Sequence, residues 1–214
     1  MKSTEFITEG VAYDHQKMLE LIKHDCRPYL MENKHSLTEL PLWRGMNSGK
    51  DGDNHAHGKY QKRNVRLDGR IPRDAPQDVH DTLNYIFNKK YGAQYRNALF
   101  ATGKKSNTYD YGQEFIIFPI GNYDYIWSEE VTDLWRKIAT DLKIAHASSR
   151  TQMSQEQENA LERMVYGLNY KKSNLEGAIA SGHEIMMRCK SYYAIDFNIY
   201  QLQDRKIDQE FLNA

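Results

Sequence analysis

The stretch Ser181-Gly-His-Glu-Ile-Met-Met-Arg-Cys-Lys-Ser-Tyr-Tyr-Ala-Ile-Asp196 predicts the strand around which the fold is built. It opens with turn-forming residues and continues with β-branched, aromatic and sulfur-containing side chains, a composition typical of a buried strand. Glu184 therefore stands at the entrance of a strand, where a carboxylate can face a cleft. The alternative is a solvated glutamate at the rim of a sheet, because charged side chains are usually exposed.

The composition favours a globular protein with no net charge. The chain has 214 residues and a mass of 25.1 kDa, which suffices for one well-cored domain. Its 29 basic residues cancel its 29 acidic ones, so any site for nucleic acid or membrane must be local. Cys26 and Cys189 each stand in an apolar pattern without a CxxC partner, which is typical of buried free thiols in a reducing compartment. No signal peptide or long apolar run is found, so we expect an intracellular, cytoplasmic protein.

Helical and extended patterns alternate and predict one α+β domain over residues 1–214, with an N-terminal helical part at 1–36 and a core at 37–214. A loop is expected at 170–181. The amphipathic pattern predicts helices at 14–33, 77–91, 128–142 and 161–168. The first of them is interrupted at Pro28, and Ser128 is expected to cap the third. Extended patterns predict strands at 37–46, at 96–100 and within 115–127 on both sides of a break at 119–122. The final segment, 197–212, predicts one more strand and a charged tail.

The predicted strand at 37–46 delivers Arg44 between apolar neighbours, with Gly45 beside it to allow close approach of the backbone. An arginine in such surroundings requires an anion. The anion is either an internal carboxylate or a bound ligand, and the residues alone leave both open.

The segment 47–60 is rich in Gly, Asp, Asn and His and is expected to be a loop that is mobile or closes on a ligand. Its His55 and His57 suggest a metal site. Two histidines in a flexible loop lack the further fixed ligands that zinc requires, so we expect no metal.

A basic strip follows at 62–74, where arginines recur within a dozen residues. Such a strip can hold phosphates or a polynucleotide backbone, but charge runs are usually solvated faces, and Asp68 and Asp74 offer internal partners. The strip consists of Arg63, Arg66, Arg70 and Arg73.

Residues 96–112 predict a strand, a small-residue turn at 101–103 and a short helix. The Thr102 hydroxyl and the backbone N–H groups at this corner can hold a polar ligand. A plain hairpin or helix cap is the alternative.

Three stretches together resemble the arginine, serine/threonine and glutamate motifs of mono-ADP-ribosyltransferases, particularly the small members encoded by tailed bacteriophages. They occur in the family's order: Leu42-Trp-Arg-Gly, Ala98-Leu-Phe-Ala-Thr-Gly and Gly182-His-Glu-Ile-Met-Met. The middle stretch departs from the pattern, since Ala101-Thr-Gly103 stands where the family has a Ser-Thr-Ser-like triplet.

The resemblance implies a split sandwich of two antiparallel sheets with flanking helices and with NAD, the co-substrate, in the cleft between the sheets. Glu184 would then be catalytic, because a carboxylate at the ribose hydroxyl stabilises the oxocarbenium-like cation that forms when the bond to nicotinamide breaks. The resemblance implies that Arg44 contacts the NAD phosphates or ribose, that the Gly45 backbone contacts the nicotinamide amide, and that Thr102 supports the glutamate. Tyr109 or Tyr111 would stack on or flank the nicotinamide.

The sequence does not identify the group that would accept ADP-ribose. Arginine-modifying members carry Gln or Glu two residues before the catalytic glutamate, whereas this chain has Gly182, which we expect on the same strand face as Glu184. Arg70 and Arg73 are candidates for contact with the acceptor or with phosphate. The expectation is NAD-dependent transfer of ADP-ribose to a protein or nucleic acid with release of nicotinamide, in the host cytoplasm if a phage encodes the chain. The alternative is a non-catalytic phage or host-interaction protein that binds acidic or phosphate-rich partners.

Overall fold

A computed structural model describes residues 15–33, 40–46, 60–72, 75–143 and 153–197. Helices and strands both contribute, as the sequence predicts. The helices are α1 (His15–Asp25), α2 (Arg27–Glu32), α3 (Gln77–Tyr91), α4 (Leu134–Asp141), α5 (Gln155–Gly167) and α6 (Leu175–Ser181), with 3₁₀ helices η1 (Tyr95–Asn97) and η2 (Lys105–Tyr111). The strands are β1 (Trp43–Met46), β2 (Tyr60–Asn64), β3 (Leu99–Thr102), β4 (Gln113–Pro119), β5 (Asp124–Trp127), β6 (Glu184–Arg188) and β7 (Ser191–Asp196).

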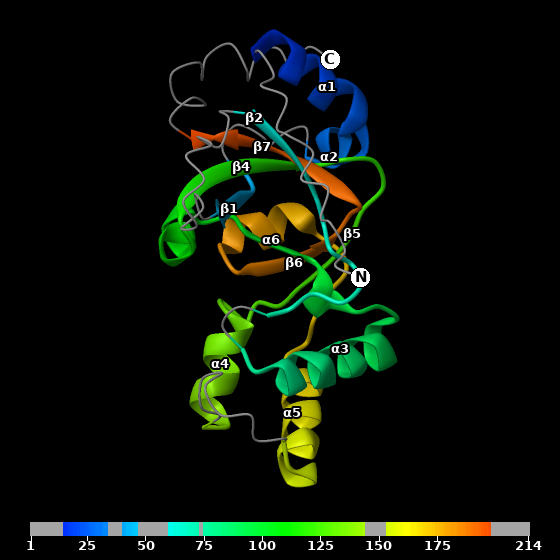
Figure 1. The fold of residues 1–214 in the computed structure, drawn as a ribbon, viewed down its shortest axis with the longest axis vertical. Coiled ribbons are helices and arrows are strands. Elements are labelled where there is room, and N and C mark those ends of the chain that lie inside the picture. The colour runs from blue at the N-terminus through cyan, green and yellow to red at the C-terminus, as the bar shows by residue number, and fades with distance from the viewer. Residues whose placement is uncertain (1–14, 34–39, 47–59, 73–74, 144–152, 198–214) are drawn as a thin grey trace, which may run out of the picture.

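The seven strands form one antiparallel sheet in the order β2-β7-β4-β1-β3-β6-β5 (Figure 1). β1 pairs with β4 over four residues but with β3 only through Trp43 and Thr102. The sheet therefore consists of two halves that meet at a single pair of residues. This confirms the α+β class with antiparallel strands, whereas the expected two separate sheets are not seen.

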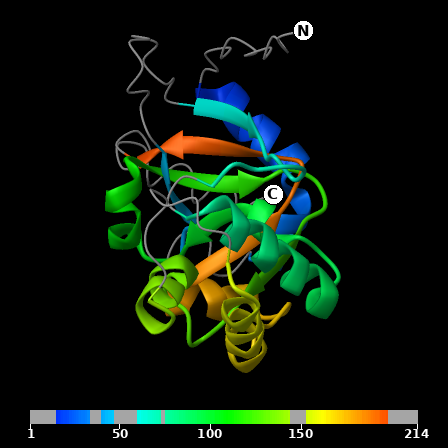
Figure 2. The same cartoon turned by 60° about the horizontal axis from the view of Figure 1, so that its bottom comes forward.

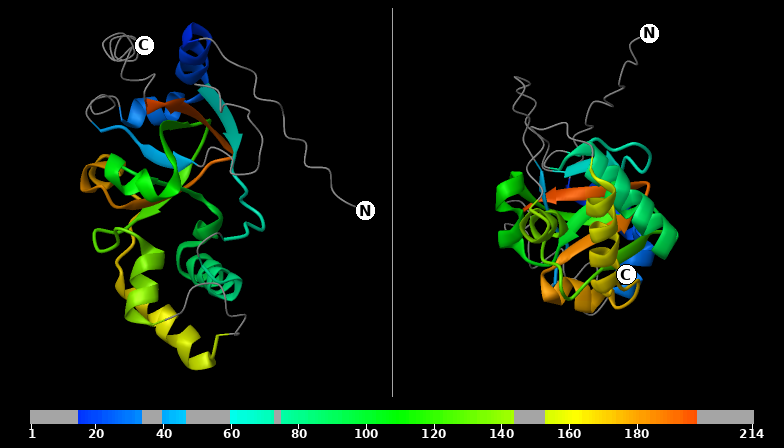
Figure 3. Two further views of the ribbon diagram at one scale, coloured as in Figure 1. Left: turned by 60° about the vertical axis from the view of Figure 1, so that its left-hand side comes forward. Right: turned by 90° about the horizontal axis from the view of Figure 1, so that it is seen from below.

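Two hydrophobic cores lie on the two faces of β6. Ile185 and Met187 belong to the core shared with α1, α2 and α6, whereas Met186 belongs to the core shared with α3, α4 and α5. Alternate side chains of a strand project to opposite faces, so Glu184 lies on the Met186 face. In Figure 1, α1 and α2 lie toward one end of the long axis and α6 lies near its middle, whereas α3, α4 and α5 lie toward the other end, where Figures 2 and 3 also show them gathered.

Local signals account for most helix boundaries. Pro28 stands in the first turn of α2, where its missing N–H costs nothing, and separates this helix from α1. Gly92 ends α3 in the left-handed conformation, at φ 79°. The predictions of a helical pair near the N-terminus and of a helix at 77–91 are confirmed, and so is the break between β4 and β5.

The stretch 181–196 is two strands rather than one. β6 pairs with β3 and β5, whereas β7 pairs with β2 and β4 in the other half of the sheet. Three further elements were not predicted: α6 replaces an expected loop, β2 begins where only a loop and a basic strip were expected, and η1 occupies the start of the strand expected at 96–100. The proposed strand at 197–212 lies, apart from Phe197, outside the described residues.

The predicted cap of α4 is wrong. Ser128 is fully buried and its hydroxyl donates to the Leu168 carbonyl, so it is committed to a tertiary contact. Asp133 is the N-cap instead, and its Oδ1 accepts the backbone N–H of Arg136 at 2.9 Å.

Both cysteines are buried and free, as predicted. Burial raises the pKa of the Cys26 thiol and raises that of Cys189 to about 12, so both are protonated at neutral pH. Neither thiol is a reactive nucleophile in this environment.

Gly103 allows α6 to pack directly against the end of β3. A Cβ at this position would overlap the backbone carbonyl of Ile179, which cannot move aside as a flexible side chain can. We expect Gly103→Ala to lower the free energy of unfolding by about 2 kcal/mol or more, measured by chemical denaturation. Gly167→Ala, at the end of α5 with no atom within 4 Å of the new Cβ, is the control and should be neutral or slightly stabilising. Equal stability of both variants would contradict the packing role of Gly103.

Candidate functional site

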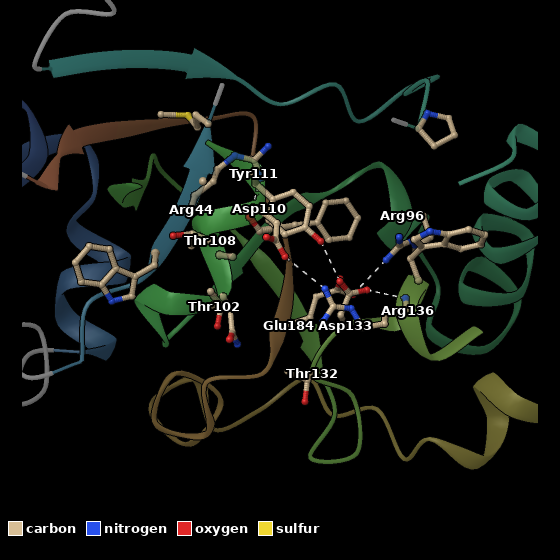
Figure 4. A pocket seen from close by; sticks show the side chains of 18 of the residues that line it. Arg44, Arg96, Thr102, Thr108, Asp110, Tyr111, Thr132, Asp133, Arg136 and Glu184 are labelled. Carbon is tan, nitrogen blue, oxygen red and sulfur yellow. Dashed lines mark hydrogen bonds and ion pairs between the residues drawn. The ribbon is translucent and has the colours of Figure 1, made fainter. Parts of the chain in front are cut away.

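A cavity of about 520 Å³ lies where the two halves of the sheet meet. Arg44 of β1, Thr102 of β3 and Glu184 of β6 all line it (Figure 4). These are the central residues of the three sequence motifs. They are far apart in the chain and are brought together because β1, β3 and β6 are neighbours in the sheet.

Glu184 is the first residue of β6, opposite Thr102, and its side chain is only 14% exposed. Arg96 donates from Nη1 to Glu184 Oε1 at 3.2 Å. Burial raises the pKa of Glu184 to about 7, against the opposing effects of Arg96 and of the Leu134 backbone N–H, while the nearby Asp133 adds to the increase. The group therefore changes charge near neutral pH, which is the property of a candidate functional carboxylate.

Arg44 is anchored in the wall of the cavity by a hydrogen bond to the backbone. Its Nη1 donates to the Phe100 carbonyl at 2.7 Å. Its Nε is buried and has no hydrogen-bond partner among the described residues. Of the two alternatives, an internal carboxylate or a bound ligand, neither is the partner seen for Nη1, whose acceptor is a backbone carbonyl. Since Arg44 also lines the cavity, its guanidinium is a candidate for contact with a ligand anion.

Further arginines stack on the Phe100 ring beside Arg44. The guanidinium carbons of Arg70 and Arg96 each lie 4.5 Å from the ring centroid. Arg70 also donates to the Ala98 carbonyl at 2.9 Å. Burial, then the charges of Arg44 and Arg96, lower the pKa of Arg70 to about 10. This wall of the cavity is therefore cationic and favours an anion.

The basic strip contributes to the cavity only in part. Arg63 and Arg70 line it, whereas Arg66 is exposed and is not among the lining residues. Arg73, the other candidate contact for acceptor or phosphate, lies outside the described residues.

Thr102 supports the turn before Glu184 rather than the carboxylate itself. Its hydroxyl donates to the Gly182 carbonyl at 2.7 Å and accepts the Lys104 backbone N–H at 3.1 Å. Asn107 donates to the same Gly182 carbonyl at 2.8 Å. The hydrogen bonds thus fix the point at which the chain enters β6.

The expectation that Gly182 shares the strand face of Glu184 is wrong. Gly182 lies outside β6 and ends α6 in the left-handed conformation, at φ 70°. A residue with a side chain would be strained there. Gly182 therefore ends α6, and its lack of a side chain does not leave a gap on the face of β6 that carries Glu184.

Gly45 and the two candidate tyrosines meet at η2. A Cβ on Gly45 would overlap the Thr108 carbonyl and lie 2.7 Å from Tyr111 Cβ, so glycine is what allows η2 to pack on β1. Tyr111 lines the cavity and donates to Asp133 Oδ2 at 2.9 Å. Tyr109 is 58% exposed and is not among the residues that line the cavity. Of the two tyrosines, only Tyr111 is placed to flank a ligand in it.

Sequence reasoning missed Arg96, His80 and Asp133, which all line the cavity. Arg96 precedes β3 in a stretch that was interpreted as strand, and His80 was assigned only to a helix. The one available signal was that Arg96 stands two residues before the middle motif.

No group of three or more His, Cys, Asp or Glu side chains in the described part of the chain is placed to hold a metal ion. His55 and His57 lie outside that part. Within the same residues, every helix is too short or too polar to cross a membrane. No protein family model, no curated protein and no solved structure matches the chain.

Proposed function

We propose that this protein is an NAD-dependent mono-ADP-ribosyltransferase that moves ADP-ribose from NAD to a macromolecular acceptor. The observation that supports the proposal is the convergence of Arg44, Thr102 and Glu184 on one cavity. A chance resemblance of three short motifs gives no reason for their central residues to meet. The two halves of the sheet, joined only through Trp43 and Thr102, are also compatible with a family in which NAD lies in a cleft between two sheets.

The proposed chemistry requires one carboxylate at the reacting sugar. The bond between ribose C1′ and the nicotinamide nitrogen breaks, and its electron pair leaves with neutral nicotinamide. The positive charge that develops on the ribose is stabilised by ionised Glu184 at a ribose hydroxyl. An acceptor nucleophile then bonds to C1′ and loses its proton, and water in the same role gives hydrolysis.

The rest of the cavity suits the remainder of NAD. Its volume of about 520 Å³ falls within the usual range for a ligand site. The guanidinium groups of Arg44 and Arg70, which both line the cavity, offer charge-assisted hydrogen bonds to a pyrophosphate. Tyr111 provides an aromatic side chain at the edge.

Incubation of the full chain with NAD labelled in its adenosine part tests the proposal. Nicotinamide should be released, and label should move either to an acceptor in a bacterial extract or, without extract, to free ADP-ribose. Binding of NAD without any nicotinamide release under either condition would contradict an enzymatic role.

The cationic wall formed by Arg44, Arg70 and Arg96 also favours a second candidate, a non-catalytic protein that binds acidic or phosphate-rich partners. Such a protein would bind inorganic pyrophosphate and release no nicotinamide. Its binding should weaken steeply with added salt. The labelled NAD experiment separates the two candidates.

Nicotinamide release should rise with pH because the reaction requires the ionised form of Glu184. Its pKa of about 7 lies above the ordinary value of 4.5, so the ionised fraction grows between pH 6 and pH 8. We expect the rate at limiting NAD to increase roughly tenfold over this interval and then level off. Initial rates in buffers of constant ionic strength measure it. A rate that is flat from pH 5 to pH 8 would place the working pKa elsewhere.

A further inference from the structure

The contact between Arg96 and Glu184 is part of a buried wall and not of the exposed rim. The Arg96 side chain is only 9% exposed. Its Nη1 lies 3.2 Å from Glu184 Oε1 and 3.7 Å from the Met186 sulfur, and its guanidinium lies over the Phe100 ring. These contacts come from β3 and β6 and leave the guanidinium little freedom to turn away from the carboxylate.

A buried amide network holds the backbone of Arg96 from behind. Asn84 of α3 accepts the Arg96 N–H at 3.0 Å and donates to Asn97 Oδ1 at 3.0 Å. Asn97 in turn donates to the carbonyl of Leu67, also at 3.0 Å. Side chains with this many satisfied partners form a rigid support.

His80 completes this network in its neutral form. His80 Nε2 lies 2.9 Å from Asn97 Oδ1 and 3.1 Å from Asn84 Nδ2, so it donates to the first or accepts from the second according to its tautomer. Burial and the charge of Arg96 lower the pKa of His80, against the hydrogen bond to Asn97. The network thus positions Arg96 without placing a second positive charge beside it.

Arg96 is the principal opposite charge at Glu184. The other groups that act on this carboxylate are Asp133, at the start of α4, Arg70, the Leu134 backbone N–H and the buried Tyr170 hydroxyl. Burial and Asp133 favour the protonated form, and among the opposing influences that of Arg96 is the largest. A glutamate in this position without Arg96 would be protonated over a wider range of pH.

We propose that Arg96 is a positioning residue that holds the Glu184 carboxylate toward the cavity and keeps it charged. The catalytic meaning of this role rests on the proposed function, in which ionised Glu184 stabilises the ribose cation. The control that Arg96 exerts on the carboxylate does not rest on it.

The titration of the Glu184 carboxyl tests the role directly. It is followed by NMR of protein labelled with ¹³C at glutamate carboxyls, and the signal is assigned by its loss in Glu184→Gln. Arg96→Gln should move the midpoint upward by about one pH unit or more. Arg96→Lys, which keeps the charge, should move it by less than half as much. Arg136→Gln removes a cavity arginine that is 75% exposed and paired with Asp110, and should move it least.

The pH profile of nicotinamide release, recorded on the same variants, should shift upward in parallel with the titration. Circular dichroism checks that each variant is folded. If Arg96→Gln fails to fold, Arg96→Met removes the same charge with an apolar side chain that fits beside Phe100 and Met186, and it carries the same expectation.

An unchanged midpoint in a folded variant without the charge would overturn the proposal for Arg96. A shifted midpoint supports it, whatever the enzymatic result. A shifted midpoint in Arg96→Gln together with no nicotinamide release by the wild type would refute the proposed function and leave the control of Glu184 by Arg96 standing.

Discussion

Replacement of Glu184 by glutamine is expected to lower the rate of nicotinamide release by about 100- to 1,000-fold, with NAD affinity nearly unchanged. Glutamine has almost the same shape and retains a carbonyl toward the ribose, but it supplies no negative charge to the developing cation. Because the side chain is nearly buried and starts a central strand, the isosteric change should preserve the packing. Single-turnover kinetics measure the rate, and calorimetry measures the affinity.

Glu176→Gln is the matched control, since it makes the same chemical change at an exposed position on α6. It should leave both quantities unaltered. Near-normal nicotinamide release from a folded Glu184→Gln variant would remove this carboxylate from the mechanism and, with it, the main support for the proposed chemistry.

The same variant should become more stable relative to the wild type as the pH rises. The folded-state pKa of Glu184, about 7, exceeds its ordinary value of 4.5, so its contribution to stability is full below pH 4.5 and is lost as the pH rises through about 7. Glutamine does not titrate. The difference in free energy of unfolding, variant minus wild type, should therefore increase from pH 5 to pH 8 by up to roughly 3 kcal/mol. Urea denaturation at several pH values measures it, and a constant difference would contradict the raised pKa.

Arg44→Lys should weaken NAD binding by about 10- to 100-fold, which corresponds to the loss of one or more charge-assisted hydrogen bonds. In the wild type, Nη1 donates to the Phe100 carbonyl while the planar guanidinium has further donors for a ligand in the cavity. A lysine ammonium cannot occupy both positions, although it keeps the charge. Calorimetric titration with NAD measures the affinity, and with Glu184→Gln as background it avoids turnover.

The control for Arg44 is Arg163→Lys, at an exposed position of α5 that does not line the cavity. It should bind NAD as the wild type does. Equal affinity of the Arg44 variant and this control would show that Arg44 serves the packing of β1 and not a ligand.

Local chemistry in the sequence determined most of the helices and the positions of the motif residues. Amphipathic spacing ending at a glycine sufficed for α3, because both signals are short-range. Arg44 and Glu184 were recognisable because each stands in a short extended stretch beside a glycine. Gly45 follows Arg44 and allows the backbone to be approached closely, and Gly182 belongs to the turn before Glu184. Short-range signals also misled: Ser128 is followed by two acidic residues as a helix cap would be, yet a distant carbonyl accepts its hydroxyl.

Only the tertiary structure decided which strands are neighbours and what surrounds the carboxylate. The sequence pattern joins β6 and β7 in one run, but their hydrogen bonds go to opposite halves of the sheet, because strand pairing depends on the whole topology. Arg96 and Glu184 meet for the same reason, through the pairing of β3 with β6. The charge state of Glu184 follows from that meeting and from burial, and neither is a property of the residues next to it in the chain.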